Sequence, residues 1–177
     1  QQELKKAPLL SGMATFPMAG MILSTYLLRI LPTSMSIIAQ ALWWFAFLLD
    51  VGLIIYFTKN YVQTKPRTNA TPSWTVLYVG IAVASLTYPV VGIVEIAYGA
   101  WIFGFTLTLY LYPLIYQDLK SNPLPRALLG QEGIYCAPFS LLLAALVRIG
   151  GSGLHGWILL VMILASQTFF FFVLSRL

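Results

Sequence analysis

Three prolines stand inside predominantly apolar stretches of the sequence, each beside hydroxyl or aromatic residues. They are Pro17, Pro89 and Pro138. A proline inside a helix removes one backbone hydrogen bond and kinks the chain. The kink exposes N–H groups, which together with hydroxyls and positive helix ends can line a path for anions without a fixed cation. The chemistry that these residues predict is therefore the passage of small anions.

Two classes of side chain adjoin the prolines and are candidates to line such a path. The hydroxyl candidates are Thr15, Ser85, Thr87 and Ser140. The aromatic candidates are Phe16, Tyr88 and Phe139, which would narrow the path, since hydrophobic constrictions can act as gates. Two alternatives stay open: a hydroxyl can bond the carbonyl one turn earlier, and an aromatic ring can serve ordinary packing.

Three further ionisable residues lie in or beside apolar stretches. Asp50 is the one acidic residue well inside a predicted span. Ionisable residues at such depth are costly and often functional, so Asp50 is a candidate for a proton-linked role, with packing or a subunit contact as the alternative. Arg29 and Arg148 stand at helix ends, where they would snorkel to the interface or attract anions to an entrance.

Enzymatic and cofactor chemistry find little support in the residue types. The chain has one cysteine, Cys136, and one histidine, His155. This makes a structural metal site very unfavourable, and no arrangement of Ser with Lys or His suggests a nucleophile. We expect no enzymatic activity, no metal and no cofactor. The net charge of +5 comes from scattered loop residues and indicates membrane topology rather than nucleic-acid binding.

The composition predicts an all-α integral membrane protein. Of its 177 residues, 59% are hydrophobic and only 8% are charged, with a mean hydropathy of +0.84, whereas a soluble domain has about 25% charged residues. Lipid must therefore be the solvent, and we expect a multi-pass protein of the cell (plasma) membrane. With about 20 apolar residues per span, the six predicted transmembrane helices cover roughly 12–31, 36–58, 74–95, 98–117, 131–149 and 154–175.

The basic residues predict the orientation of these helices. Eight of the ten fall on one side of the predicted spans, namely Lys5, Lys6, Lys59, Lys65, Arg67, Lys120, Arg126 and Arg176. By the positive-inside rule this side is cytoplasmic, which places the connections 59–73 and 118–130 inside the cell. The chain then forms three successive helical hairpins.

Each predicted hairpin pairs a proline-containing helix with an unbroken, aromatic-rich one. The first, third and fifth helices also carry small residues four apart, as in Gly20 and Ser24, Gly80 and Ala84, and Ser140 and Ala144. Small residues at this spacing let helix backbones approach closely. The alternation predicts an inner set of kinked helices that lines a path and an outer set that faces lipid, with simple helix packing as the alternative for any single pair.

Five stretches in order resemble the tellurite-resistance/dicarboxylate transporter family. They are ATFPMAGMILSTYL (14–27), PSWTVLYVGIAVASLTYPVVG (72–92), LYLYPLIYQDL (109–119), APFSLLLAAL (137–146) and, more weakly, ASQTFFFFVL (165–174). Each is apolar and of modest specificity alone, but the ordered set is more specific. The family includes bacterial tellurite-resistance proteins, fungal malate and sulfite transporters and the plant guard-cell slow anion channel.

The resemblance implies a fold of ten helices in five hairpins, with an inner ring of five helices and assembly as trimers. Residues 1–177 would then be a single but partial transmembrane domain, its six helices being the middle six of the fold. The start at Gln1 agrees with a segment of a longer protein. The family's gating aromatic lies on a later inner helix, so no residue here inherits that role.

The implied activity is transport or channelling of small anions. C4-dicarboxylates such as malate come first, and tellurite, sulfite, chloride and nitrate are the other options. The expected partners are the lipid bilayer, the anion and further copies of the chain. The alternative is a non-conducting membrane assembly subunit or a degenerate fragment of such a transporter.

Overall fold

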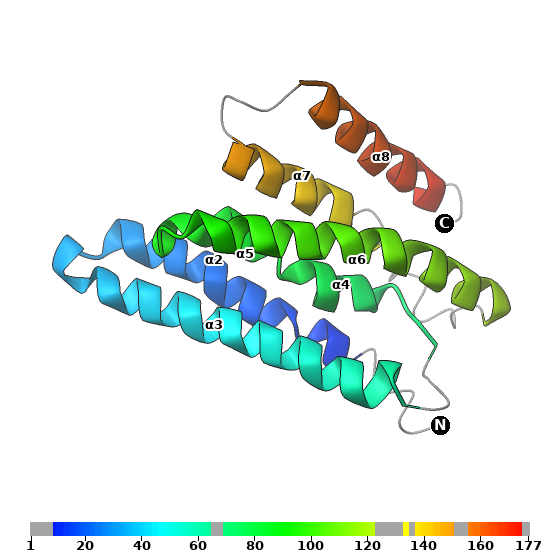
Figure 1. Ribbon diagram of the computed structural model, residues 1–177, viewed down its shortest axis with the longest axis horizontal. Helices are drawn as coiled ribbons and strands as arrows, with labels where there is room; N and C mark the ends of the chain where they lie inside the picture. The colour runs from blue at the N-terminus through cyan, green and yellow to red at the C-terminus, as the bar shows by residue number, and fades with distance from the viewer. Residues whose placement is uncertain (1–8, 65–68, 123–132, 135–136, 151–155, 175–177) are drawn as a thin grey trace.

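The computed structural model describes residues 9–64, 69–122, 133–134, 137–150 and 156–174, and these form an all-helical bundle (Figure 1). The described residues contain no β-strand, which confirms the predicted fold class. The principal helices are α2 (Thr15–Ile30), α3 (Ser36–Phe57), α4 (Ser73–Gly80), α5 (Val83–Thr87), α6 (Val94–Ser121), α7 (Ala137–Gly150) and α8 (Gly156–Leu174). Short helical turns are η1 (Thr33–Met35), η2 (Thr58–Val62) and η3 (Tyr88–Val90).

Several of these helices are long and apolar enough to cross a bilayer. Three stretches qualify alone, namely Leu9–Ile30, Thr33–Val62 and Val94–Ser121, and the bent pair of Ser73–Gly80 and Val83–Val90 forms a fourth when taken as one span. Helices suit this environment because they satisfy every backbone polar group internally. α7 is apolar but has only 14 residues, which makes it shorter than the hydrocarbon core of a typical bilayer.

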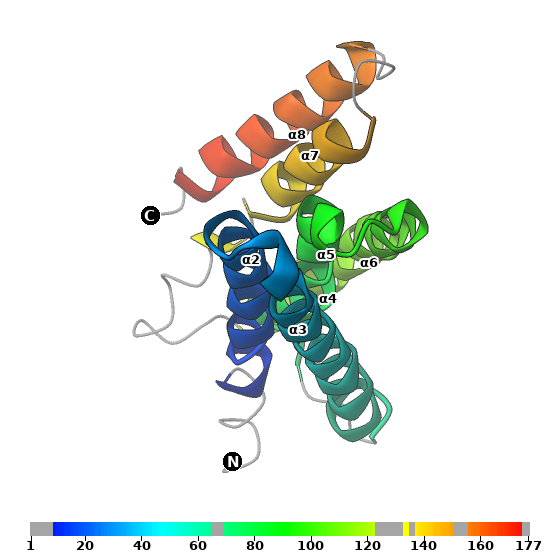
Figure 2. The same ribbon diagram turned by 90° about the vertical axis from the view of Figure 1, so that its left-hand side faces the viewer.

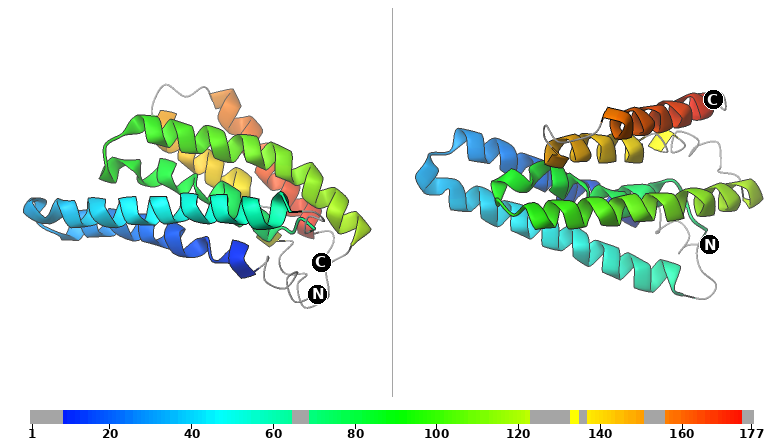
Figure 3. Two further views of the ribbon diagram at one scale, coloured as in Figure 1. Left: turned by 60° about the horizontal axis from the view of Figure 1, so that its bottom comes forward. Right: turned by 45° about the horizontal axis from the view of Figure 1, so that its top comes forward.

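The bent pair α4–α5 occupies the centre of the bundle. Viewed along the helices, it lies between the α2–α3 hairpin and the helices α6 and α7 (Figure 2). α5 contacts α2, α6 and α7, while α4 contacts α6 and, to a lesser extent, α2, α3 and α7. α7 packs on α5 and α6, and α8 packs on the outer side of α7 (Figure 3). The first, third and fifth predicted segments are thus neighbours in a row.

The burial of side chains follows from this arrangement. In α4 every residue is buried except Val76, which is half-buried. α3 instead buries one stripe, made of Ala39, Trp43, Ala46, Asp50, Ile54 and Phe57. Large apolar residues such as Phe45 and Leu48 remain exposed on the opposite face of α3. An exposed apolar face of this length is what contact with lipid or with other membrane helices requires.

The three predicted proline kinks have a different form in the structure. Pro17 is the third residue of α2 and Pro138 the second residue of α7, so both lie in the first turn, where a helix does not need the missing N–H. The α2 helix is preceded by a break at Met13–Ala14. Pro89 lies in η3, in the first turn of a 3₁₀ helix rather than inside an α-helix.

The sharpest break in the third segment has no proline. α4 and α5 are bent by 41° at Ile81–Ala82. The backbone there uses 3₁₀-type hydrogen bonds, in which Ala82 N–H donates to the Val79 carbonyl and Ala84 N–H to the Ile81 carbonyl, both at 2.9 Å. These bonds satisfy groups that a break would otherwise expose, so this bend offers few free N–H groups to an anion.

The fourth predicted segment is an unbroken helix, as predicted, but it contains a proline of its own. Pro113 lies inside α6, which runs continuously from Val94 to Ser121. A proline is therefore present in the interior of an aromatic-rich helix that was expected to lack one. The proline positions alone therefore do not distinguish inner from outer helices. The contacts between helices make that distinction.

The two connections predicted to be cytoplasmic meet at one end of the bundle. Ala70, which precedes α4, donates its backbone N–H to the Asp118 carboxylate near the end of α6, at 2.8 Å. We call this end the loop end. The opposite end, where α2 turns into α3 and η3 turns into α6, is called the turn end, and Gly92 has a φ of +75° there, a conformation that glycine adopts without strain.

A candidate anion path

Glycines set how closely the neighbouring helices approach. A Cβ atom on Gly20 would lie 3.0 Å from the Cβ of Ala46, so this glycine serves the packing of α2 on α3. A Cβ atom on Gly80 would lie 2.7 Å from the Sδ of Met18, so this glycine makes room for the methionine side chain between α2 and α4. The first contact is simple helix packing, and the second lies on the face that α2 presents to the central helix.

A narrow hollow of about 70 Å³ lies where α2, α4 and α7 meet. Its walls are formed by Met18 from α2, by Val76 and Gly80 from α4, and by Pro138 and Leu141 from α7. These side chains are apolar, and apolar constrictions can gate a path by dewetting. We call this space the narrow hollow.

A wider hollow of about 470 Å³ lies toward the turn end, between α2, α5–η3 and α7. Two arginines contribute to its wall, Arg29 from the last turn of α2 and Arg148 from the last turn of α7. The remaining wall residues are Ile22, Thr25, Leu28, Leu86, Thr87, Pro89 and Val90. We call this space the wide hollow.

The two hollows lie on one continuous face of the helices. On α2, Met18 belongs to the narrow hollow, while Ile22, Thr25 and Arg29 belong to the wide one. Successive members of this set are three or four residues apart, so they share one helix face. On α7, Leu141 and Arg148 are seven residues apart and share a face in the same way. The face therefore runs from an apolar hollow to a hollow that two arginines border.

Three of the predicted site residues border the hollows. Pro138 borders the narrow hollow, and Thr87 and Pro89 border the wide one. The Thr87 hydroxyl donates to the Val83 carbonyl at 2.9 Å and accepts a hydrogen bond from Trp43 Nε1 at 2.7 Å. The hydroxyl proton of Thr87 is therefore used in a bond to the protein backbone, so Thr87 lines the wide hollow without offering a hydrogen-bond donor to an anion.

The other predicted hydroxyls also have protein partners. Thr15 donates to the Gly12 carbonyl at 2.9 Å and Ser140 to the Ala137 carbonyl at 3.1 Å. Both are local bonds to the preceding turn, the alternative that the sequence left open. Ser85 is buried and donates to the Ala97 carbonyl of α6 at 2.7 Å, which fixes the central helix to its neighbour.

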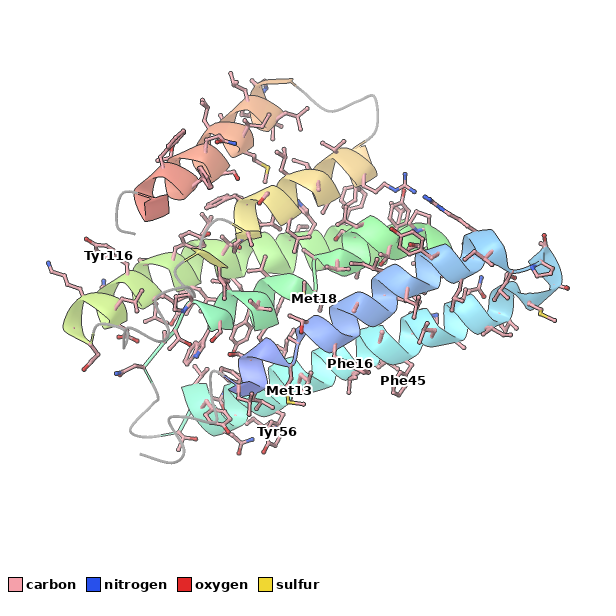
Figure 4. All side chains as sticks on the ribbon, turned by 180° about the vertical axis from the view of Figure 1, so that it is seen from behind. Met13, Phe16, Met18, Phe45, Tyr56 and Tyr116 are labelled. Carbon is pink, nitrogen blue, oxygen red and sulfur yellow. The ribbon has the colours of Figure 1, made fainter. Side chains whose placement is uncertain are left out.

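The predicted aromatics point away from both hollows or serve packing. Phe16 is 71% exposed and, with Pro17, lines an apolar groove between α2 and α3 that Phe45 also borders. Figure 4 shows Phe16 near Phe45, whereas Met18 lies on the side of α2 toward the central helix. The Phe139 ring packs against Tyr112 of α6 with ring centroids 5.3 Å apart. Tyr88 is half-buried at the start of η3.

Asp50 is fully buried on the stripe by which α3 packs into the bundle. Among the described residues, neither of its carboxylate oxygens has a hydrogen-bond partner. The antiparallel pairing that sets Gly20 against Ala46 places Asp50, one turn along α3, at about the depth of Pro17. Asp50 borders neither hollow.

Sequence reasoning did not select Met18, Thr25 or Leu141. They are ordinary residues for a membrane helix, and only the neighbouring helices decide which of their faces encloses a space. The available signal was the spacing of Met18, Ile22, Thr25 and Arg29, which is an i, i+4, i+7, i+11 stripe ending in a charge. Within the described part of the chain no group of His, Cys, Asp and Glu residues could hold a metal ion.

A family model described as voltage-dependent anion channel matches residues 1–176. The chain belongs to this family. The match covers the chain almost from end to end, and it confirms the relationship that the ordered apolar stretches indicated. No curated protein and no solved structure gave a significant match. As a voltage-dependent anion channel family member, the chain is a membrane protein of a family that transports anions.

Proposed function

We propose that this protein moves small anions across the cell (plasma) membrane along the face shared by α2, α4–α5 and α7. One observation carries the proposal: these three helices lie in a row and border both hollows, while α3, α6 and α8 pack behind them or at their side. The path passes the basic opening of the wide hollow and then the apolar narrow hollow. Met18, Val76 and Leu141 form its constriction.

The substrates we propose are C4-dicarboxylates such as malate, with tellurite, sulfite, chloride or nitrate as the other options. Family membership supports anions as the class. The narrow hollow carries no charge, so it would pass an anion only after partial dehydration and without holding it tightly. Weak binding along a path permits release as well as entry.

The arc of three helices does not surround the path by itself. We propose that two further hairpins complete the inner ring of five helices, and that three copies of the protein assemble as a trimer. In this arrangement the loop end faces the cytoplasm, as the eight basic residues indicate. The apolar groove between α2 and α3 would then lie against a neighbouring helix or lipid.

Anion efflux from proteoliposomes tests the proposal. Malate, nitrate and chloride are loaded in turn, and the 177-residue chain is compared with a version extended by its flanking coding sequence. Met18→Trp fills the narrow hollow and should abolish most of the efflux. Phe45→Trp is the matched control, because Phe45 is 63% exposed and borders neither hollow, so the substitution should leave efflux unchanged.

Each outcome assigns the function differently. Efflux that Met18→Trp removes and Phe45→Trp spares supports a path along this face. Efflux that both variants retain would move the path elsewhere in the protein. Absence of efflux from every version would favour the alternative, a non-conducting assembly subunit or a degenerate transporter.

A further inference from the structure

Two arginines from helices far apart in the sequence open onto the same hollow. Arg29 ends α2 and Arg148 ends α7, and both border the wide hollow of about 470 Å³ at the turn end. Both side chains are exposed. Among the described residues, neither arginine forms an ion pair with a carboxylate, and the acidic residue in the first turn of α6, Glu95, is exposed and unpaired as well.

A purely structural role would explain either arginine by itself, but it would not explain why both border the same hollow. A cation in the last turn of a helix is stabilised by the negative end of the helix dipole, and a long side chain near a helix end can reach the membrane interface. Neither effect requires the two guanidinium groups to border one space. Two cations beside one hollow repel each other, and a bound anion would relieve that repulsion.

The remaining polar groups of the wide hollow cannot take the place of the arginines as donors. The Thr25 hydroxyl donates to the Ile22 carbonyl at 2.7 Å. The Thr87 hydroxyl donates to the Val83 carbonyl. The side-chain donors left to a ligand are therefore the two guanidinium groups, each a planar fork of N–H donors that matches two oxygens of one anion.

We propose that Arg29 and Arg148 form a binding site for an anion with several oxygen atoms, a carboxylate or an oxyanion, at the mouth of the anion path. The site concentrates its ligand in front of the narrow hollow and favours carboxylates and nitrate over chloride, because a spherical halide cannot accept two parallel hydrogen bonds from one fork. This inference rests on the proposed function, in which the face of α2, α4–α5 and α7 conducts anions.

Binding is tested first without any requirement for transport. The purified chain in a neutral detergent, free of added lipid, is unfolded by heat in the presence of disodium malate, sodium nitrate or sodium chloride at constant ionic strength. A ligand that binds the folded state raises the midpoint temperature in proportion to the logarithm of its concentration once the site saturates. Malate and nitrate should raise it more than chloride does.

The variants separate the site from general charge effects. The double variant Arg29→Gln with Arg148→Gln should lose the stabilisation by malate and nitrate. Lys120→Gln is the matched control, because it removes one charge from an exposed residue at the loop end, and it should keep the effect. Arg29→Lys with Arg148→Lys retains both charges without the forks, and it should keep a weakened effect with less preference for nitrate over chloride. If the double glutamine variant does not fold, the double lysine variant still tests the site.

Transport provides the second readout and separates two sources of anion. In vesicles of phosphatidylcholine alone, the double glutamine variant should raise the half-saturating anion concentration about tenfold or more, the loss expected for charge-assisted hydrogen bonds. The same shift should appear in vesicles that also contain phosphatidylglycerol. Stabilisation that appears only when phosphatidylglycerol is added would assign the site to a lipid headgroup and overturn a free anion as its ligand.

The outcomes for the site and for the proposed function are distinguishable. Two results would overturn the site even if the protein conducts. One is that malate and nitrate stabilise the wild type and the double glutamine variant equally, and the other is that Lys120→Gln loses as much of this stabilisation as the double glutamine variant does. Stabilisation that depends on the arginines in a protein that shows no efflux would support the site and reject the proposed function.

Discussion

The Sδ atom of Met18 lies 2.7 Å from the position that a Cβ atom on Gly80 would occupy. The methionine of α2 thus rests directly on the backbone of α4, one residue before the central helix bends. Any side chain at position 80 must displace the thioether. Because methionine is unbranched and flexible, the displacement moves it within the narrow hollow rather than separating the helices.

Gly80→Ala should therefore fold but reduce anion efflux, because the displaced Met18 side chain occupies the constriction. We expect a loss of stability of about 1–3 kcal/mol, the usual cost of overpacking, and a severalfold fall in efflux. The double variant Gly80→Ala with Met18→Ala should recover most of the lost stability and most of the lost efflux. Efflux and thermal unfolding measured in a double-mutant cycle check this, and additive effects of the two substitutions would contradict the contact.

Trp43→Phe should destabilise the bundle by about 1 kcal/mol, because it removes the hydrogen bond from the indole N–H to Thr87 and leaves a buried hydroxyl with one partner fewer. The neighbouring Trp44 is exposed and provides the matched control. Trp44→Phe should change the midpoint of thermal unfolding little. Equal shifts for the two variants would mean that the bond to Thr87 contributes nothing measurable.

Asp50→Asn should leave the rate of anion efflux largely intact, because Asp50 is buried in the packing of α3 and borders neither hollow. Efflux is measured across a range of external pH for the wild type and the variant. A pH dependence that disappears in Asp50→Asn would instead assign a proton-linked role to this residue and make proton coupling the leading mechanism.

Pro113→Ala and Pro138→Ala should have different effects despite the same chemical change. Pro113 lies inside α6, where alanine restores a backbone donor and removes a clash with the preceding turn, so we expect a gain of about 1 kcal/mol and unchanged efflux. Pro138 lies in the first turn of α7 and borders the narrow hollow. Its replacement should alter efflux with little effect on stability, and unchanged efflux would remove Pro138 from the path.

The hydropathy of the sequence predicted where the helices lie, because a membrane helix is an apolar run whatever its partners are. Of the six predicted spans, three or four are long enough in the described residues to cross a bilayer. Hydropathy predicted the bends less well. The sharp bend at Ile81–Ala82 lies between apolar residues, beside a glycine whose packing against Met18 is a tertiary contact. Local propensity carries no information about such a contact.

The candidate site was predicted only in part, for a related reason. Thr87, Pro89 and Pro138 were selected and do border the hollows, since a kink or helix start tends to lie where helices diverge. Phe16 and Phe139 were selected by adjacency in sequence, yet neighbours in a helix point in directions about 100° apart. Phe16 consequently faces the groove beside α3, and Phe139 faces Tyr112.

The burial of α4 on nearly every side has an evolutionary consequence. Seven of its eight residues are buried, so a substitution there meets neighbours in all directions, whereas a change on the exposed face of α3 meets only the surrounding membrane. Drift between related proteins should accordingly exchange apolar residues freely on the outer faces of α3 and α8. The central helix α4 should keep both its residue sizes and its glycine. It should therefore be the part of the chain whose sequence stays most similar between distant members of the family.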